Sequence, residues 1–235
     1  MAMPMTGTIT EAALYRLLAW LSPAFPTGAY SYSHGIEYAV ECGLVRDEAS
    51  FKTWLEGILL RGAGAIDGPI FAAAYSAAAR PNLTALGAIA ERAAAWRGAA
   101  ELALEAEAQG AALLATARAA WDSPRLAVLA EAIQPYRVTL PVAVAMAAAA
   151  AEIELASSLA GYFHAFTANL IAAGGRLIPL GQTAGQRLLA ALENAVASAA
   201  RHGLETTLDG AGAAAPMVDW CSMRHEMQYT RLFRS

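Results

Sequence analysis

Four residues in one short stretch carry the groups that a nucleophilic enzyme would need. Ser31 and Ser33 offer hydroxyl groups, and His34 offers a base. Glu37 could orient that base, which would make a small hydrolase without a cofactor. Neighbouring residues rarely reach nucleophile–base geometry, and helix capping or hydrogen bonding explains the same residues. We expect no catalytic residue and no enzymatic activity, with the hydrolase as the alternative.

A thiol and an imidazole near the end of the chain form a second candidate group. Cys221 and His225 are four residues apart, so they would share a helix face and could bind nickel. The remaining histidines are scattered, and a satisfied surface or interface pair explains these two residues more simply. A phosphate-binding glycine loop followed by lysine is also missing from the sequence. We therefore expect no metal site and no cofactor.

Carboxylates recur along one predicted helix, at Glu101, Glu105 and Glu107. Like charges four residues apart repel each other slightly, so this face is either solvated or receives arginines from another helix or a partner. Gly110, on the same helix, would allow another segment to approach closely.

The stretch from Ser22 to Glu37 interrupts the helical pattern of the chain. Pro23 and Pro26 stop a helix, and several aromatic residues lie on what would be a connecting loop. Such a loop is either a packed plug or a recognition surface. The residues that we expect to shape it are Phe25, Pro26, Gly28, Tyr30, Tyr32, His34 and Glu37.

Two further segments are candidates for docking. Pro179, Leu180, Gly181 and Gln182 form a compact turn that serves either as a helix entry or as a docking corner. The segment 226–235 places apolar residues between arginines, as interface hot spots do, or else docks on its own core. The candidate residues there are His225, Glu226, Arg231, Leu232, Phe233 and Arg234.

Composition indicates a helical domain that surrounds these segments. Of the 235 residues, 57% are hydrophobic and only 15% are charged, and alanine accounts for much of the excess. Alanine favours close-packed helices, and no long stretch alternates with a period of two. We predict one all-α globular domain of about ten helices over residues 1–235, with residues 1–9 flexible.

Charge, hydropathy and cysteine content indicate which partners and which compartment to expect for this protein. The net charge of −4 gives no basic surplus for nucleic acid. Mean hydropathy is +0.38, yet the longest apolar run, Val138–Ala151, is too short to span a membrane. Two distant cysteines favour a reduced, cytoplasmic protein. We expect neither nucleic acid nor membrane as a partner.

Local signals predict where helices begin and end. Thr10, Asp47 and Asn82 are expected to cap helices, and Asp67 followed by Pro69 predicts a further helix start. Other expected boundaries are a stop at Gly174–Gly175, one helix over 186–201 capped by Gly203, and a last helix over 217–229.

Three motifs in order resemble the UreF family of urease accessory proteins. They are SPAFPTGAYSYSHGIE at 22–37, RLIPLGQ at 176–182 and HEMQYTRLFRS at 225–235, supported by Trp54–Leu55 and by Asp67 with Pro69. The likeness extends over essentially the whole chain. One departure is Ala103, where the family's Glu-Leu-Arg segment would have arginine, so a charge contact at that position is in doubt.

The resemblance implies a non-catalytic, all-α homodimeric chaperone in urease maturation. It implies that a UreD-type protein, called UreH in some organisms, binds this chain and that the pair recruits and regulates the GTPase UreG. The complex would then insert nickel into apo-urease. On this interpretation the 226–235 tail contacts the UreD-type partner, and the 22–37 loop and the 179–182 turn shape the remaining surface.

Overall fold

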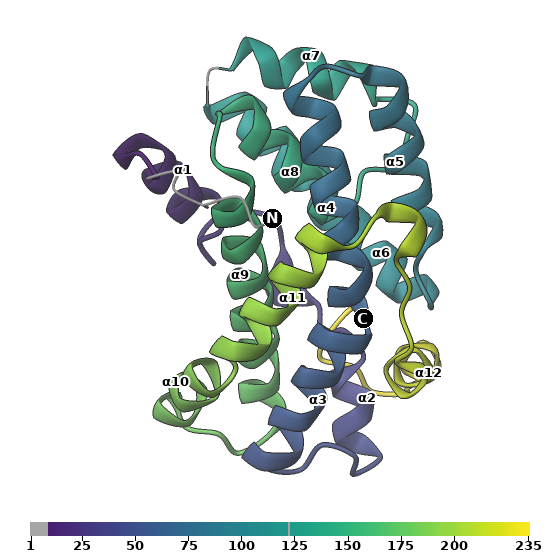
Figure 1. Ribbon diagram of the computed structural model, residues 1–235. Coiled ribbons are helices and arrows are strands. Elements are labelled where there is room, and N and C mark those ends of the chain that lie inside the picture. The colour runs from purple at the N-terminus through teal and green to yellow at the C-terminus, as the bar shows by residue number, and fades with distance from the viewer. Residues whose placement is uncertain (1–8, 122) are drawn as a thin grey trace.

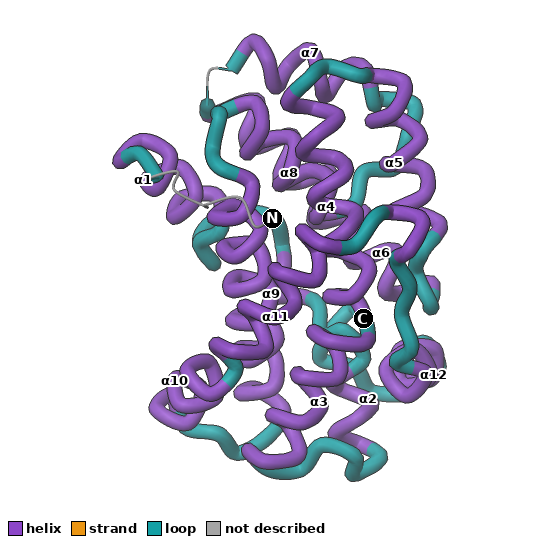
Figure 2. Tube along the Cα trace, in the orientation of Figure 1, coloured by secondary structure: helices purple, strands orange, loops and turns teal. Residues whose placement is uncertain are grey.

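The computed structural model describes residues 9–121 and 123–235, and within these ranges the regular structure is entirely helical (Figures 1 and 2). In chain order the elements are α1 (Glu11–Trp20), η1 (Ala29–Ser31), α2 (Ile36–Glu41), α3 (Glu48–Arg61), α4 (Ala63–Ala79), α5 (Leu83–Ala95), α6 (Ala100–Ala120), α7 (Pro124–Ala132), α8 (Leu140–Ala150), α9 (Leu155–Leu177), α10 (Gln182–Ala191), α11 (Glu193–Glu205), η2 (Leu208–Gly210) and α12 (Pro216–His225). The all-α prediction is confirmed. The flexibility expected for residues 1–9 falls, except at Ile9, outside the described residues.

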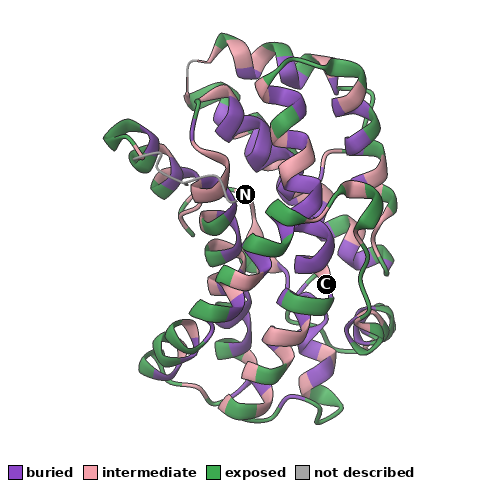
Figure 3. Ribbon diagram, viewed as in Figure 1, coloured by how far each residue is buried: buried purple, intermediate pink, exposed green. Residues whose placement is uncertain are grey.

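The centre of the fold is α8, which is buried along almost its whole length (Figure 3). It packs against α4 on one side and α6 on another, and α4 also packs against α11. Alanine and small apolar residues make up most of α8, so helix axes can approach closely around it. The alanine surplus in the composition thus becomes a closely packed core.

The predicted caps of three helices are confirmed. Thr10 and Asn82 accept hydrogen bonds from the main-chain N–H groups of Ala13 and Ala85. Asp47 forms a reciprocal capping box with Ser50 at the start of α3. Each side-chain oxygen satisfies an N–H group that has no partner within the helix.

The helix start predicted at Asp67 is wrong. Helix α4 begins at Ala63, directly after the break at Gly62, and runs through Asp67 with Pro69 in its interior. Proline there removes one helical hydrogen bond, but burial of α4 against α8 and α11 holds the helix together. Asp67 is buried inside the helix and pairs with Arg97, so it carries a charge contact rather than a cap.

Glycine signals also misplaced two other boundaries. Helix α9 passes through Gly174–Gly175 and ends at Leu177, because Gly174 makes room for the ring of Phe51. The helix expected over 186–201 is two helices that meet at Leu192, and Gly203 lies inside the second, against Gly68 of α4. Here glycine serves helix packing and not helix termination.

The final helix is shorter than predicted. Helix α12 ends at His225 and not at Tyr229, and residues 226–235 continue as an ordered segment without helix.

One stretch is long and apolar enough to cross a membrane, Glu48–Ala79, which joins α3 and α4. Within the fold, 67% of its most apolar window is buried against other helices. That burial is typical of a core helix pair.

Candidate functional site

Three buried carboxylates gather around the end of the chain. Glu37 lies on α2, and Glu101 and Glu105 lie one turn apart on α6. Each of these residues is less than 8% exposed. We call these three carboxylates, together with His34 and His225 beside them, the acidic cluster. Three carboxylates can be buried together only if hydrogen-bond donors or positive charges surround them.

The main chain of the tail supplies some of these donors. The N–H groups of Leu232 and Phe233 both donate to the Glu37 carboxylate, at 2.7 and 2.9 Å. Further along, the Ser33 N–H donates to the main-chain oxygen of Ser235 at 2.8 Å, and the Arg234 N–H donates to that of Ser31 at 2.8 Å. The tail therefore runs beside the 31–33 segment.

His225 joins two of the carboxylates. Its Nδ1 lies 2.6 Å from Glu101, and its Nε2 lies 3.0 Å from Glu37. Only the imidazolium form can donate from both nitrogens, so the geometry favours a charged ring between two carboxylates. Arg231 donates to the second oxygen of Glu101 at 2.7 Å, which brings the charges of this group into balance.

Glu105 has a different set of partners. The Ser235 hydroxyl donates to it at 3.0 Å, and the His34 Nδ1 lies 3.3 Å away. Gln109, one turn along α6, donates to its other oxygen at 3.3 Å. The face of α6 that the sequence suggested for arginines is thus satisfied within the chain, and exposed Arg137 pairs with Glu107 in the same way.

Phe233 anchors the tail in the fold, with only 4% of its surface exposed. The Arg176 guanidinium lies 4.2 Å from its ring centre, and that arginine also donates to the Tyr30 carbonyl at 2.6 Å. Arg234 lies over the Tyr32 ring, 5.6 Å from its centre. The loop, the end of α9 and the tail therefore form one cation–aromatic assembly.

The structure divides the predicted docking residues into two groups. The buried group, which contributes to the acidic cluster or to its packing, is Tyr32, His34, Glu37, His225 and Phe233. The exposed group is Pro26, Tyr30, Pro179, Gly181, Gln182, Glu226, Arg231, Leu232 and Arg234. Phe25, Gly28 and Leu180 are half-buried, with Gly28 in the left-handed conformation at φ 73°. The 22–37 loop is therefore part plug and part surface.

Exposed apolar side chains lie on α12 and on the tail, and of these the sequence analysis singled out only Leu232. Met217, Trp220 and Met223 are exposed on α12, spaced three residues apart. On the tail that follows α12, Met227, Tyr229 and Leu232 are also exposed. We call these six residues the α12–tail patch. The three-residue spacing of large apolar side chains outside the predicted core was the signal available in the sequence.

The arrangement that a hydrolase would need is not formed by its candidate residues. The Ser33 hydroxyl donates to the main-chain oxygen of Ser235 and accepts from the Glu37 N–H. His34 faces Glu105, while the Glu37 carboxylate faces the tail and His225. Serine, histidine and Glu37 therefore form no relay, and Ser33 and Glu37 both bind the tail.

The Cys221–His225 pair does not form a metal site either. Both ring nitrogens of His225 face carboxylates, as described above. Burial raises the pKa of the Cys221 thiol to about 12, and the Cys42 side chain beside it adds to the shift. Among the described residues no group of three or more histidine, cysteine or acidic side chains is arranged to hold a metal ion.

A second buried polar group lies next to the acidic cluster. Asp67 pairs with Arg97 at 2.9 Å and accepts from the Tyr162 hydroxyl at 2.6 Å. Burial, with Asp67 close by, raises the pKa of Tyr162 well above its usual value, so the phenol remains a donor. These residues tie α4 and α9 to the segment between α5 and α6.

Comparison with known proteins gives a consistent result. A family model described as UreF matches residues 45–193. A urease accessory protein UreF of Granulibacter bethesdensis is 50% identical over 230 residues, covering 98% of this chain and 97% of that protein. Proteins of the same name from Rhodopseudomonas palustris strain BisB5 and Bradyrhizobium diazoefficiens are 49% and 48% identical, covering 96% and 95% of this chain and 92% of each relative.

Proposed function

Because the chain belongs to the UreF family of urease accessory proteins, we propose that it is a non-catalytic scaffold of urease maturation in the cytoplasm. In this role it binds a UreD-type protein and, with that protein, recruits and regulates the GTPase UreG. The assembly then delivers nickel to apo-urease. The observation that carries the proposal is the α12–tail patch, an exposed apolar surface fixed in place by the buried acidic cluster.

The patch has the properties of a protein-docking surface. Leu232 is 62% exposed and Tyr229 is fully exposed, although both residues lie on a tail whose neighbouring Phe233 is buried. Methionine and aromatic side chains are enriched in interface cores, and a rigid support lowers the entropic cost of binding. We therefore assign the UreD-type partner to this patch.

Substitutions that leave the tail docked provide the sharpest test. We expect Trp220→Ala combined with Leu232→Ala to weaken binding of the UreD-type protein by at least about tenfold, because central aromatic and apolar anchors dominate interface energies. The measurement is biolayer interferometry with purified proteins. The matched control is Val128→Ala on α7, which is also exposed but lies at the far end of the fold (Figure 1).

Two outcomes would count against this assignment. One is unchanged affinity in the double variant with its circular dichroism spectrum intact. The other is an equal loss of affinity in the Val128→Ala control.

The remaining exposed candidates support contacts with UreG and with a second copy of the chain. Pro26, Tyr30 and Gln182 lie outside the patch, so they are free for UreG when the UreD-type protein is bound. Helix α1 carries Tyr15 and Leu18 exposed on one face and Leu17 buried on the other, which favours the homodimer. Light scattering after size exclusion, on the chain alone and then with both partners, tests dimer and ternary assembly together. A monomer that binds neither partner would overturn the proposal.

A further inference from the structure

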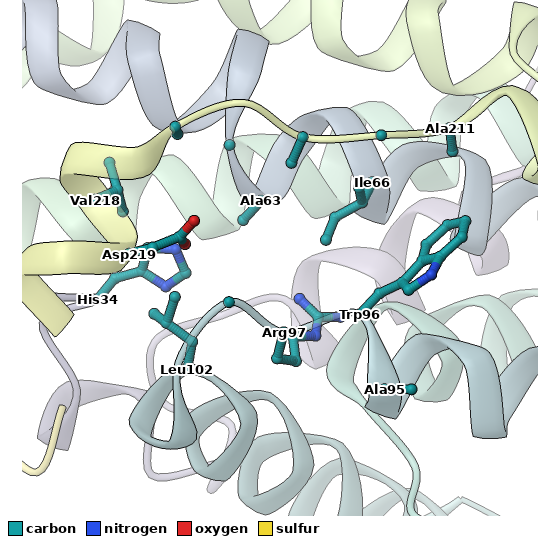
Figure 4. Close-up of a pocket in the computed structure, with 15 residues that line it drawn as sticks. His34, Ala63, Ile66, Ala95, Trp96, Arg97, Leu102, Ala211, Val218 and Asp219 are labelled. Atoms are coloured by element: carbon teal, nitrogen blue, oxygen red, sulfur yellow. The ribbon is translucent and has the colours of Figure 1, made fainter. Parts of the chain in front are cut away.

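A cavity of about 400 Å³ opens between α4, the start of α6, the 211–215 segment and α12 (Figure 4). His34 and Asp219 lie together at one end of it, and Trp96 lies at the other. A second, much smaller cavity of about 20 Å³ adjoins it at His34, Arg97 and Leu102. It is large enough for about one water molecule.

One nitrogen of His34 faces this region without a partner. The side chain is 7% exposed, and its Nδ1 is turned toward Glu105. Among the described residues its Nε2 has no hydrogen-bond partner. With a proton on Nδ1 toward the carboxylate, Nε2 holds a lone pair, which is how metal-binding histidines are usually oriented.

Asp219 supplies an oxygen beside this nitrogen. It lies in the first turn of α12, with its carboxyl group packed against Gly98. Partial burial raises the pKa of Asp219, and His34 counteracts the increase, so the two side chains are within electrostatic reach of each other. Within the described part of the chain, no ion pair uses this carboxylate.

The charges around the cavity favour a cation. Arg97 is the positive charge that lines it, and Asp67 neutralises that charge at 2.9 Å. Glu105 behind His34 and Asp219 in front of it leave an excess of negative charge. Arg97 Nη2 has no hydrogen-bond partner among the described residues, so the preference for a cation applies to the His34–Asp219 end of the cavity and not to the part that Arg97 lines.

We propose that His34 Nε2 and the Asp219 carboxylate bind one divalent transition-metal ion, with water in the cavity completing its coordination shell. An imidazole nitrogen with a carboxylate oxygen suits Ni²⁺, Co²⁺ or Zn²⁺ rather than Mg²⁺. Two protein ligands make a weak and exchangeable site, unlike the four ligands of a structural zinc site. Asp219 lies on α12 but is not one of the patch residues, so metal binding and partner binding are tested by different substitutions.

Equilibrium dialysis of the untagged full chain against Ni²⁺ tests the site. We expect about one ion per chain, and we expect His34→Gln and Asp219→Asn each to weaken Ni²⁺ binding by at least about tenfold. The matched controls are His164→Gln and His202→Gln, which remove exposed imidazoles on α9 and α11 and should leave this binding unchanged. With Co²⁺ as the probe, we expect the visible absorption bands of the bound ion to be lost in the same two variants, because these bands depend on the groups that coordinate the ion.

A folding defect is separated from a binding defect by thermal melting of each variant. His34→Gln alters the acidic cluster, whereas Asp219→Asn removes a partly exposed carboxylate outside it, so the second variant is expected to keep the wild-type melting temperature. Ni²⁺ binding that persists in a folded Asp219→Asn variant would overturn the proposal. Absence of binding at millimolar Ni²⁺, or an equal loss in the exposed-histidine controls, would also overturn it.

Discussion

At the scale of single residues, several side chains of types that could do chemistry are buried and hydrogen-bonded. His225 and His34 are both held by carboxylates, and Ser33 is held by the main chain of the tail. These residue types could suggest catalysis in a linear sequence. In the fold both His225 nitrogens and His34 Nδ1 face carboxylates, and the Ser33 hydroxyl donates to the tail, because most buried polar atoms are paired.

The two thiols should therefore differ sharply in reactivity. Cys42 is exposed, whereas Cys221 is buried with a pKa of about 12. Only the thiolate attacks, so at pH 8 about one Cys221 in ten thousand is reactive at any time. We expect an aromatic disulfide reagent to label one thiol per native chain rapidly and two thiols in denaturant.

Cys42→Ser is the control for this measurement. It should remove the rapid reaction altogether, and raising the pH to 9 should not restore it, since the pKa of Cys221 is far higher. Equal labelling of both thiols in the native protein would contradict the burial of Cys221.

At the scale of elements, several glycines determine how closely helices pack. Gly110 of α6 meets the main chain of Val138 and Thr139 at the entry to α8, so an added methyl group would collide with backbone atoms there. The close approach expected at this glycine is confirmed, and the approaching segment belongs to the same chain. Gly175 of α9 has no atom within 4 Å of the position that a Cβ would take.

These two glycines give a matched test of helix packing. We expect Gly110→Ala to destabilise the fold by about 1–3 kcal/mol, because the core is overpacked where backbone cannot yield. Gly175→Ala should stabilise it by about 0.5–1 kcal/mol, because alanine loses less entropy in a helix. Urea denaturation measures both changes in the free energy of unfolding, provided that its dependence on urea concentration is the same in each variant. Equal changes in the two variants would contradict the packing of α6 against α8.

At the scale of the molecule, the last residues of the sequence form part of the buried core. Residues 231–235 satisfy Glu37, Glu101 and Glu105, and they add one buried aromatic ring. A segment at a chain terminus would ordinarily tolerate change. Removing this segment would leave the buried carboxylates of Glu37, Glu101 and Glu105 without several of their hydrogen-bond donors.

Deleting residues 226–235 should accordingly destabilise the whole domain. We expect a loss of at least about 3 kcal/mol in the free energy of unfolding, because removing one side of a buried charged network leaves the other side without donors. Leu232→Ala, which trims an exposed side chain of the same tail, should change stability by less than about 1 kcal/mol. Both values come from urea unfolding.

A deletion that leaves stability unchanged would contradict the role of the acidic cluster. The comparison of the deletion with Leu232→Ala also guides the interpretation of binding experiments. Loss of a partner after deletion can reflect unfolding, whereas loss after Leu232→Ala reflects the surface.

Sequence alone determined the features that depend on neighbouring residues. The all-α class and the caps at Thr10, Asp47 and Asn82 follow from propensities and hydrogen bonds within one turn. The same local rules misjudged Pro69 and Gly174–Gly175, where packing against distant helices outweighs the local preference. Family motifs indicated the important segments without indicating how these segments meet.

Only the tertiary structure decided what those segments do. Glu37, Glu101 and His225 are separated by 64 and 124 residues, yet they meet within hydrogen-bonding distance, since α12 packs against both α2 and α6 and the tail returns to them. No local pattern encodes that convergence. It follows from the requirement that every buried charge find its partner, which the complete fold alone can satisfy.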